Sequence, residues 1–497
     1  MTELKIYNSY TRQKEIFTPF TPGHVGMYVC GPTVSGESHL GHARGFISFD
    51  FIYRYLLHIG YKVRYVRNIT DAGHFEEEGR AAEDKISKKA ILEKLEPMEL
   101  VQKYTNLFHW AMKRFNNLEP SIEPTATGHI VEQINMIHII LAKGFAYEVN
   151  GSVYFDVKKY AEQFPYGKLS GRIMDDLLET TRELDGQEDK KNSQDFALWK
   201  AAPPEHIMRW QSPWGEGFPG WHIECSAMAT KYLGKQFDIH GGGMDLQFPH
   251  HESEIAQSNI CNQAMPVRYW LHNNMITING KKMGKSYNNQ ISLTEMFSGS
   301  HPVLKQAFSP MTIRFFILQT HYRSTLDFSN DALQAAEKGL KRLWDAYEIL
   351  QSLEMNFDPL HTDRELNEKI NRYLSQLDEF MSDDFNTAKV LANLFEMVPI
   401  INSLKDKRIV SGAISAETFG SMQRYFKDFM ENILGLCGED QHSDGKLDGV
   451  MNLLIDMRKE AKSKKDYATS DKIRVHLQKL GILLQDEKDG SMSYTYN

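Results

Sequence analysis

The sequence predicts an α/β protein in which a doubly wound parallel sheet is interrupted by an inserted segment and followed by a helical C-terminal third. Three observations lead to this fold class. A strand, a helix and a second strand follow one another between residues 26 and 71. Proline-rich stretches enclose a region from about 120 to 210, and beyond about 328 the apolar residues recur at helical spacing. Strand–helix–strand order is typical of a crossover within a parallel sheet.

The predicted sheet begins with the apolar run GMYVCG, residues 26–31, which stops at a Gly-Pro pair. Residues 40–60, LGHARGFISFDFIYRYLLHIG, place apolar side chains at helical spacing and end on glycine, a typical helix C-terminal residue. Residues 61–71, YKVRYVRNITD, return to the β-branched and aromatic content of a strand. Ligands bind beyond the carboxyl ends of the strands in such sheets, which is where Cys30 and His39 fall.

The region from about 120 to 210 has the features of an insertion into this sheet. It contains a strand of its own, SVYFDV (152–157), and a highly charged loop before the second proline-rich stretch. The main sheet is expected to resume with QFDIHGGG (236–243). In HNNMITINGKKMGKS (272–286), the pair Asn279-Gly280 predicts a hairpin turn between alternating residues.

The C-terminal third is predicted to be a bundle of helices. Residues 328–353 open on residues that cap helices and place one apolar stripe along a helix, formed by Leu333, Ala336, Leu340, Leu343, Tyr347 and Leu350. Further helices are expected to about residue 480. The last stretch, LGILLQDEKDGSMSYTYN, indicates two short strands joined by a turn.

Composition places the chain among ordinary globular proteins. It has 497 residues, enough for roughly three domains, with 41% hydrophobic and 25% charged residues. The N-terminus shows no signal-peptide pattern and no apolar run reaches membrane-spanning length. The four cysteines are far apart in sequence, which disfavours a disulfide framework. We therefore expect a reducing cytoplasm as the location, and no membrane partner.

The distribution of charge is uneven. A formal net charge of −8 argues by itself against a nucleic-acid partner. Residues 458–479, however, contain eight basic and three acidic side chains within one helical-looking segment. This segment is either a solvated helix face or a surface that faces RNA.

Two short motifs suggest phosphate chemistry. In HLGH, His39 and His42 lie at the start of the helix after the first strand, where imidazoles can donate to phosphate oxygens. In GKKMGKSYNN, Lys282 and Lys285 lie on a glycine-containing loop that could hold a polyphosphate. The spacing is not that of a Walker A motif. The alternatives are surface histidines and a solvated turn.

A third set of residues has the chemistry of metal ligands. Cys30, Cys225, His250 and Glu254 could supply two thiolates, an imidazole and a carboxylate, which suits zinc. His250 and Glu254 are four residues apart, so both project from one face of a helix. The pattern is not HExxH, so a zincin protease is unsupported. Small buried thiols and a core histidine remain the alternative.

Together these motifs resemble cysteinyl-tRNA synthetase, a class I aminoacyl-tRNA synthetase family. The resemblance runs from about residue 5 to about 485, and two of its blocks are highly specific to that family. The matching stretches, in order, are CGPTVSGESHLGHARGFISFD, NITD, EDKI, GWHIECSAM, FDIHGGGMDLQFPHHESEIAQS, KKMGKS, HYRSTLDFS and DDFNTA.

The resemblance assigns a role to each candidate residue. It implies one zinc ion per chain, with the ligands Cys30, Cys225, His250 and Glu254. It implies His39, His42, Lys282 and Lys285 as catalytic residues, and Gly31, His39, Gly41, His42 and Lys285 as ATP-binding residues. It implies a pocket for substrate cysteine near Thr70, Trp221, His240 and Asp245.

The activity implied by the resemblance has two steps. L-Cysteine and Mg-ATP form cysteinyl-adenylate and pyrophosphate, and cysteine is then transferred to the 3′-terminal adenosine of tRNA(Cys). Zinc would recognise the substrate as its thiolate, whereas serine offers only a hard hydroxyl, so no editing domain is needed. Two alternatives remain: a ligase that passes cysteine to a small amine, and a non-catalytic zinc or RNA-binding module. A monomer is expected.

The implied architecture is a Rossmann-like catalytic domain with a connective insertion, a stem-contact region and a helical anticodon domain. The predicted boundaries are 1–120 and 210–267 for the two catalytic halves, 121–209 for the insertion, 268–327 for the stem-contact region, 328–445 for the bundle and 446–497 for the anticodon-binding segment. Three features depart from the family pattern: Gly284 within KMGKS, where the family has serine, the run AGHFEEEGRAA at 72–82, and a C-terminal end without tryptophan.

Overall fold

The computed structural model describes residues 3–72, 86, 89–90, 95–172, 189–204, 206–284, 287, 289–357, 361–438, 444–464, 466–479, 482–486 and 492–496. The chain forms two compact units, Met1–Leu436 and Cys437–Asn497. Each unit is described by itself.

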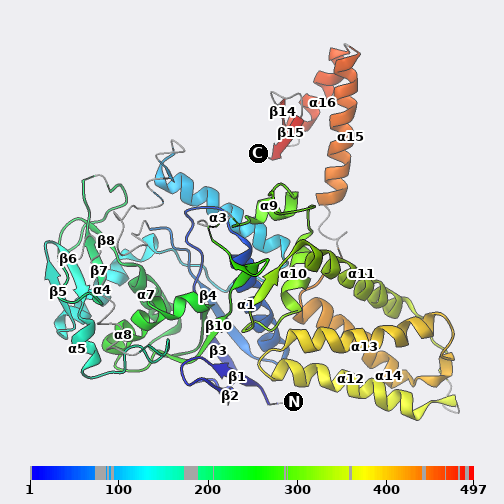
Figure 1. Cartoon of the computed structure of the whole chain (residues 1–497), viewed down its shortest axis with the longest axis horizontal. Coiled ribbons are helices and arrows are strands. Elements are labelled where there is room, and N and C mark those ends of the chain that lie inside the picture. Colours follow the sequence, from blue (N-terminus) through cyan, green and yellow to red (C-terminus); the bar gives the residue numbers. More distant parts are fainter. Residues whose placement is uncertain are drawn as a thin grey trace. The chain divides into compact units, whose positions relative to one another are not determined.

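The first unit is built on a four-stranded parallel sheet with the order β10-β9-β3-β4 (Figure 1). Its strands are β3 (His24–Val29), β4 (Lys62–Arg67), β9 (Phe237–Gly243) and β10 (Val267–Asn273). Helix α1 (Leu40–His58) connects β3 to β4, which are parallel neighbours. The predicted strand–helix–strand unit and the α/β fold class are therefore confirmed. Gly60, with φ of 93°, follows the end of α1 as predicted.

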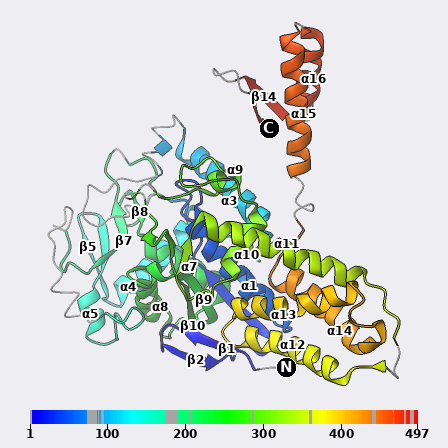
Figure 2. The same cartoon turned by 45° about the vertical axis from the view of Figure 1, so that its right-hand side comes forward.

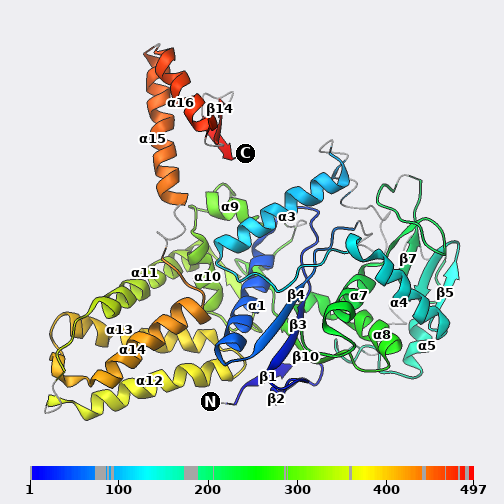
Figure 3. The same ribbon diagram turned by 180° about the vertical axis from the view of Figure 1, so that it is seen from behind.

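The inserted region has a separate antiparallel sheet with the order β5-β6-β7-β8. The strands are β5 (Ala146–Val149), β6 (Ser152–Phe155), β7 (Phe196–Ala201) and β8 (Gly217–Pro219), and helices α4 (Ile130–Ala142) and α5 (Val157–Ala161) accompany them. This sheet shares one hydrophobic core with α7 (Trp221–Leu233) and α8 (His250–Asn262) (Figure 3). Strand β8 thus belongs to the inserted sheet although it follows residue 209; the domain boundaries themselves stay predictions.

A small sheet follows the main one, with the order β12-β11-β13. Its strands are β11 (Ile276–Ile278), β12 (Lys281–Lys282) and β13 (Leu326–Phe328). β11 and β12 form the predicted hairpin, and both turn residues have positive φ, 49° at Asn279 and 75° at Gly280. Those angles are the ones that a two-residue type I′ turn requires, and Asn-Gly adopts them readily.

Helices α11, α12, α13 and α14 pack side by side in the bundle (Figure 2). The predicted stripe of α11 is buried at all six positions. The bundle elements are α10 (Pro310–Leu318), α11 (Asn330–Ser352), α12 (Arg364–Ser382), α13 (Thr387–Lys405), α14 (Ala416–Lys427) and a π-helical turn η6 (Asp428–Ile433). A buried ion pair attaches the bundle to α1, because Asp50 accepts from Arg314 on α10 at 2.5 Å. Asp50 also accepts from Arg54 of its own helix at 2.8 Å.

The remaining elements of the first unit lie at its edges. They are the hairpin β1 (Lys5–Asn8) and β2 (Gln13–Ile16), helices α3 (Pro97–Arg114) and α9 (Leu293–Ser298), and the 3-10 turns η1 (Thr127–His129), η2 (Met244–Gln247) and η5 (Ser411–Ala413). The loop after β1 is bonded to the main sheet, since Ser9 N–H donates to the carbonyl of Trp270 at 2.8 Å.

The second unit consists of α15 (Asp444–Ser463), α16 (Tyr467–Lys479) and the antiparallel strands β14 (Ile482–Asp486) and β15 (Met492–Tyr496). The two strands confirm the expected C-terminal pair. Of the predicted basic segment, Arg458 is only 3% exposed, so it does not belong to a solvated face. Lys459, Lys464, Lys472 and Arg474 are exposed.

Candidate active site

The four predicted metal ligands come together from three separate parts of the chain. One donor atom from each of Cys30, Cys225, His250 and Glu254 lies within 4.8 Å of all the others. Cys225, His250 and Glu254 are buried, and Cys30 is partly buried. Segments 195 residues apart in sequence thus meet at the carboxyl end of the parallel sheet.

The elements around the cluster explain this convergence. Cys30 directly follows β3, and its N–H donates to the carbonyl of Gly241 on the neighbouring strand β9 at 3.1 Å. Cys225 lies in the second turn of α7. His250 and Glu254 lie in the first two turns of α8 and are in contact, with His250 Nε2 3.1 Å from Glu254 Oε1. The predicted shared helix face is confirmed.

The cluster is electrostatically strained when only protons occupy it. Burial raises the pKa of Cys30 far above its usual value, and the neighbouring Cys225 and Glu254 raise it further. A hydrogen bond from Cys30 lowers the pKa of Cys225 to about 7. Burial by itself lowers the pKa of His250, but Cys225 and Glu254 outweigh it and raise that pKa to about 10. Cys30 therefore holds its proton more tightly than a thiol in water, whereas Cys225 loses its proton more readily beside the charged His250.

A divalent cation fits this donor set. Two sulfurs, one imidazole nitrogen and one carboxylate oxygen are ligands that zinc accepts at a tetrahedral site. A positive charge at the centre would also relieve the repulsion among three buried anionic groups. The donors are held by further contacts, since His222 Nδ1 lies 2.9 Å from His250 Nδ1 and His240 Nε2 lies 2.9 Å from Glu254 Oε2.

A second possible grouping shares two of these residues. Cys30 and Glu254 also lie within 4.8 Å of His240 and His251, measured between donor atoms. His251 Nε2 is 3.3 Å from Cys30 Sγ, and its Nδ1 is 2.8 Å from His272 Nε2. The imidazoles of His251 and His272 therefore lie next to the cluster, on the side of β10. The sequence carried a signal for His251, the double histidine of FPHHE, but it did not identify the neighbours His222 and His272.

The residues expected to hold substrate cysteine have different surroundings. Thr70 is buried, and its hydroxyl donates to Glu224 Oε2 at 3.0 Å. Trp221 packs its ring against His250, with the ring centroids 4.2 Å apart. His240 is buried and bonded to Glu254. Asp245 is exposed on η2. Thr70, Trp221 and His240 thus lie around the metal cluster, and Asp245 lies on the surface beyond β9.

His39 and His42 begin helix α1 and cap it reciprocally. His42 Nδ1 accepts the N–H of His39 at 3.1 Å, and His39 Nδ1 accepts the N–H of Gly41 at 3.1 Å. Because each Nδ1 is an acceptor, each neutral ring carries its proton on Nε2. The rings are stacked with centroids 3.8 Å apart. Burial and then His39 lower the pKa of His42 to about 3, so His42 is a neutral donor at physiological pH.

Both predicted glycines have close neighbours, and at Gly31 these neighbours require glycine. A Cβ on Gly31 would lie 1.4 Å from the carbonyl oxygen of Asn68, so a side chain there is impossible without moving the backbone. A Cβ on Gly41 would lie 3.0 Å from Met283 Cε. This last contact places the loop after β12 directly beside the start of α1.

The predicted lysines lie on or after this hairpin. Lys282 is exposed on β12. Lys285 lies outside the described residues, and so does the run at 72–82 except for Ala72. The role of each stays a prediction.

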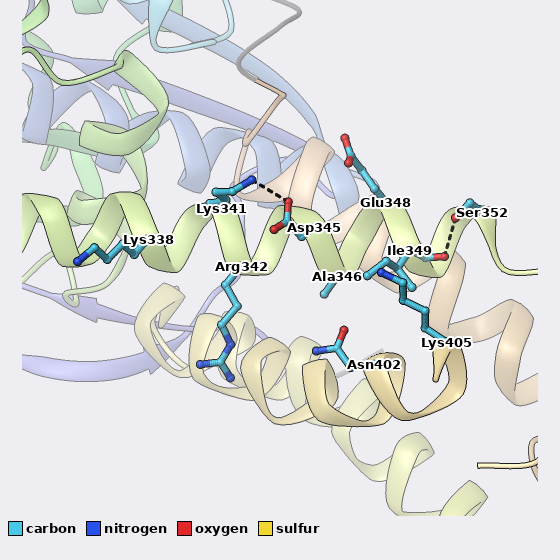
Figure 4. Close-up of a pocket in the computed structure, with 10 residues that line it drawn as sticks. All are labelled: Lys338, Lys341, Arg342, Asp345, Ala346, Glu348, Ile349, Ser352, Asn402 and Lys405. Carbon is cyan, nitrogen blue, oxygen red and sulfur yellow. Dashed lines mark hydrogen bonds and ion pairs between the residues drawn. The ribbon is translucent and has the colours of Figure 1, made fainter. Parts of the chain in front are cut away.

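A surface groove of about 860 Å³ lies between α11 and α13, lined by Lys338, Arg342, Asn402 and Lys405 among others (Figure 4). It shares no residue with the metal cluster. Its charges are partly paired, as Lys341 Nζ lies 3.4 Å from Asp345 Oδ1. This groove therefore lacks the convergent donors that mark the cluster near Cys30. No helix in the described parts of the chain has the length and apolarity needed to span a membrane.

Comparison with known proteins identifies the architecture. Residues 16–338 match the model of the class I (C) tRNA synthetase catalytic domain, and residues 376–438 match the DALR domain. The chain is 57% identical over 493 residues to a cysteine–tRNA ligase of Bacteroides fragilis, covering 98% of both chains. It is 46% identical over 503 residues to a cysteine–tRNA ligase of Chlorobaculum tepidum, covering 99% of both.

Solved structures with little sequence similarity share the fold. A methionyl-tRNA synthetase of Mycobacterium tuberculosis superposes with a TM-score of 0.56 at 11% identity, over 82% of this chain and 89% of that one.

Proposed function

Because the chain belongs to the cysteine–tRNA ligases, a family of class I aminoacyl-tRNA synthetases, we propose that its buried cluster binds one zinc ion and selects L-cysteine. Cys30, Cys225, His250 and Glu254 would hold the ion. The observation that carries this proposal is their convergence within 4.8 Å, at the sheet end where class I ligands bind. When bound there, zinc supplies a thiophilic Lewis acid that a cysteine side chain satisfies and a serine side chain does not.

The protein around the cluster keeps this recognition site rigid and dry. Trp221 packs against His250, and Thr70 is bonded to Glu224 beside Cys225. His240 orients the Glu254 carboxylate through a hydrogen bond. An apolar pocket separates substrates that differ by a small group by only about 1–3 kcal/mol. Discrimination by donor chemistry can be larger, because the wrong substrate leaves a buried charged centre without its ligand.

Activation requires charge to be stabilised on ATP while the substrate carboxylate attacks the α-phosphorus and pyrophosphate leaves. His39 and His42 present neutral Nε2–H donors from the first turn of α1. Lys282 on the neighbouring hairpin, and Lys285 three residues later in the sequence, would supply positive charge, and Mg²⁺ would arrive with ATP. Gly41 would let a flat ligand approach the backbone closely, whereas Gly31 makes room for the carbonyl of Asn68. The Asp245 carboxylate would accept a hydrogen bond from the substrate amino group.

Transfer completes the reaction when the 3′-terminal adenosine of tRNA(Cys) attacks the adenylate carbonyl and AMP leaves. The DALR match and the second unit supply the tRNA-binding part of this proposal. A ligase that passes cysteine to a small amine would have no use for that region. We propose a monomer acting in a reducing cytoplasm, where the four cysteines form no disulfide and Cys30 and Cys225 remain available to the metal.

The decisive experiment is ATP–pyrophosphate exchange with cysteine, with serine as the control amino acid. We expect exchange with cysteine only, and charging of tRNA(Cys) as the second readout. Exchange without charging would favour the small-amine ligase. Exchange by protein stripped of metal would contradict the zinc proposal.

A further inference from the structure

Arg44 occupies an unusual position in helix α1, two residues after His42. Its side chain is only 1% exposed. Nε donates to the carbonyl of Asn274 at 3.1 Å, and Nη2 lies within hydrogen-bond distance of the carbonyls of His321, Tyr322 and Ser324, at 3.1, 3.3 and 2.5 Å. All four acceptors are backbone oxygens. Burial lowers the pKa of Arg44 to about 10, so the guanidinium stays charged at neutral pH.

These acceptors lie immediately before two neighbouring strands. Asn274 precedes β11, and Ser324 precedes β13, with which β11 is paired in parallel. Arg44 therefore ties the starts of both strands to α1. Strand β11 continues into the hairpin that carries Lys282, so Arg44 holds the entrance of the lysine-bearing segment.

The exit of the same segment is also attached to α1. Leu40 N–H donates to the carbonyl of Ile291 at 3.2 Å, and Leu293 N–H donates to the carbonyl of Ser38 at 2.8 Å. The segment between Asn274 and Ile291 thus begins and ends on the helix turn that holds His39 and His42. Arg44 joins the entrance to α1, and the Asn274 N–H adds a backbone bond to the carbonyl of Tyr322 at 2.8 Å, whereas the exit is joined to α1 by backbone bonds.

A second set of contacts fixes the other side of the turn at 321–324. Asp384, in the bundle, accepts from the Tyr322 hydroxyl at 2.8 Å and from Arg323 Nε at 2.7 Å. Asn274, at the entrance of the lysine-bearing segment, is also bonded to this turn, because its Nδ2 donates to the carbonyl of Arg323 at 2.9 Å. The turn is therefore held from two directions, and its carbonyls offer Arg44 a fixed target.

We propose that Arg44 is a positioning residue for adenylate formation, which fixes the lysine-bearing hairpin relative to His39 and His42 so that both reach the same triphosphate. This inference rests on the proposed function. A planar guanidinium can bond to both strand entrances at once, whereas a lysine ammonium is a point charge on a flexible stem. Misplacement of a catalytic group by about 1 Å can cost about 100-fold in rate.

The test compares Arg44→Lys with Arg54→Lys. Arg54 is a matched control, because it lies on the same helix, is buried, and bonds to the carbonyls of Asn116 and Asn432 and to Asp50, away from the hairpin. We expect Arg44→Lys to lower kcat of cysteine-dependent exchange by about 10- to 100-fold, with KM for cysteine and zinc content within about twofold of wild type. Arg54→Lys should lower the melting temperature about as much as Arg44→Lys does, but its kcat should stay within about twofold of the wild-type value.

Asn274→Ala keeps the proposal testable if Arg44→Lys does not fold. We expect a smaller loss of kcat, about 3- to 10-fold. If Arg44→Lys does fold, the double variant should lose less than the product of the single effects. Equal loss of kcat in the Arg44 and Arg54 variants would overturn the proposal, as would a parallel loss of cysteine affinity. Failure of the proposed function would be seen separately, as absence of exchange in the wild-type protein.

Discussion

The candidate metal cluster and the lysine hairpin differ strongly in burial, although the proposed function assigns both to one active site. Cys225, His250 and Glu254 are at most 3% exposed, whereas Lys281 and Lys282 on the hairpin are exposed. The cluster must distinguish a thiol from a hydroxyl, and this requires fixed donors that water cannot replace. The hairpin must meet a charge that develops during reaction, which long cationic side chains can do from solvent. The proposed function thus separates selection and rate enhancement in space.

The largest expected effect is on the cluster. Cys225→Ser should reduce zinc content to near zero and cysteine-dependent exchange by about 100-fold or more, because a hydroxyl replaces a buried thiolate donor. ATP binding should change little. Metal analysis and exchange rates measure these outcomes, with Cys261→Ser as the control, since Cys261 contacts only the carbonyl of Met136 among the hydrogen bonds of the described residues. Full exchange by a metal-free Cys225 variant would show that the buried cluster is not needed to recognise cysteine.

Removing a positive charge from the hairpin should affect rate rather than recognition. We expect Lys285→Ala to lower kcat of exchange by about 100-fold with KM for cysteine nearly unchanged. Lys281→Ala is the matched control, as Lys281 is an exposed neighbour on β12 outside the predicted catalytic set. A comparable loss of cysteine affinity in the Lys285 variant would show that the two regions are not separate.

Lowering the pH should reduce the free energy of unfolding, because His272 is buried with a low pKa. Burial, and then the nearby His240, lower the pKa of His272 to about 3, against about 6.5 in the unfolded chain. The unfolded chain therefore binds more protons between these values, so stability is highest above about pH 6.5 and falls as pH decreases. From pH 7 to pH 5, His272 should cost about 2 kcal/mol of the free energy of unfolding. Denaturant titrations of wild type and His272→Gln measure this, and identical pH slopes would contradict it.

The smallest effect is expected in the second unit, which resembles the hairpin in exposing several cations, among them Lys459, Lys464 and Lys472. Replacing Lys462, Lys464 and Lys465 by Gln should weaken tRNA binding by less than about tenfold and reduce the salt slope by at most about 2. Lys464 contributes less than a free cation, because it lies 2.5 Å from Glu460. Binding measured at several salt concentrations checks this. Charging that is indifferent to the change at every salt would identify the segment as a solvated face.

Much of the local structure was predictable because it depends on contiguous residues. The apolar stripe of α11 is buried at the expected positions, and Asn279-Gly280 forms the expected turn. The types of metal ligand were also predictable, because His250 and Glu254 share a helix face and the family pattern supplied the two cysteines. These features depend on helical periodicity, turn angles and donor chemistry, which are determined by residue types and by residues close together in the sequence.

Other features depend on which strands lie side by side, and only the tertiary structure decided them. The order β10-β9-β3-β4 brings Cys30 to His251 and His272, which no spacing indicated. No motif or spacing indicated Arg44, yet its guanidinium joins segments 230 and 280 positions away. A linear sequence specifies which groups can bond, whereas packing decides which of them meet, because burial leaves each donor only the partners that neighbouring elements supply.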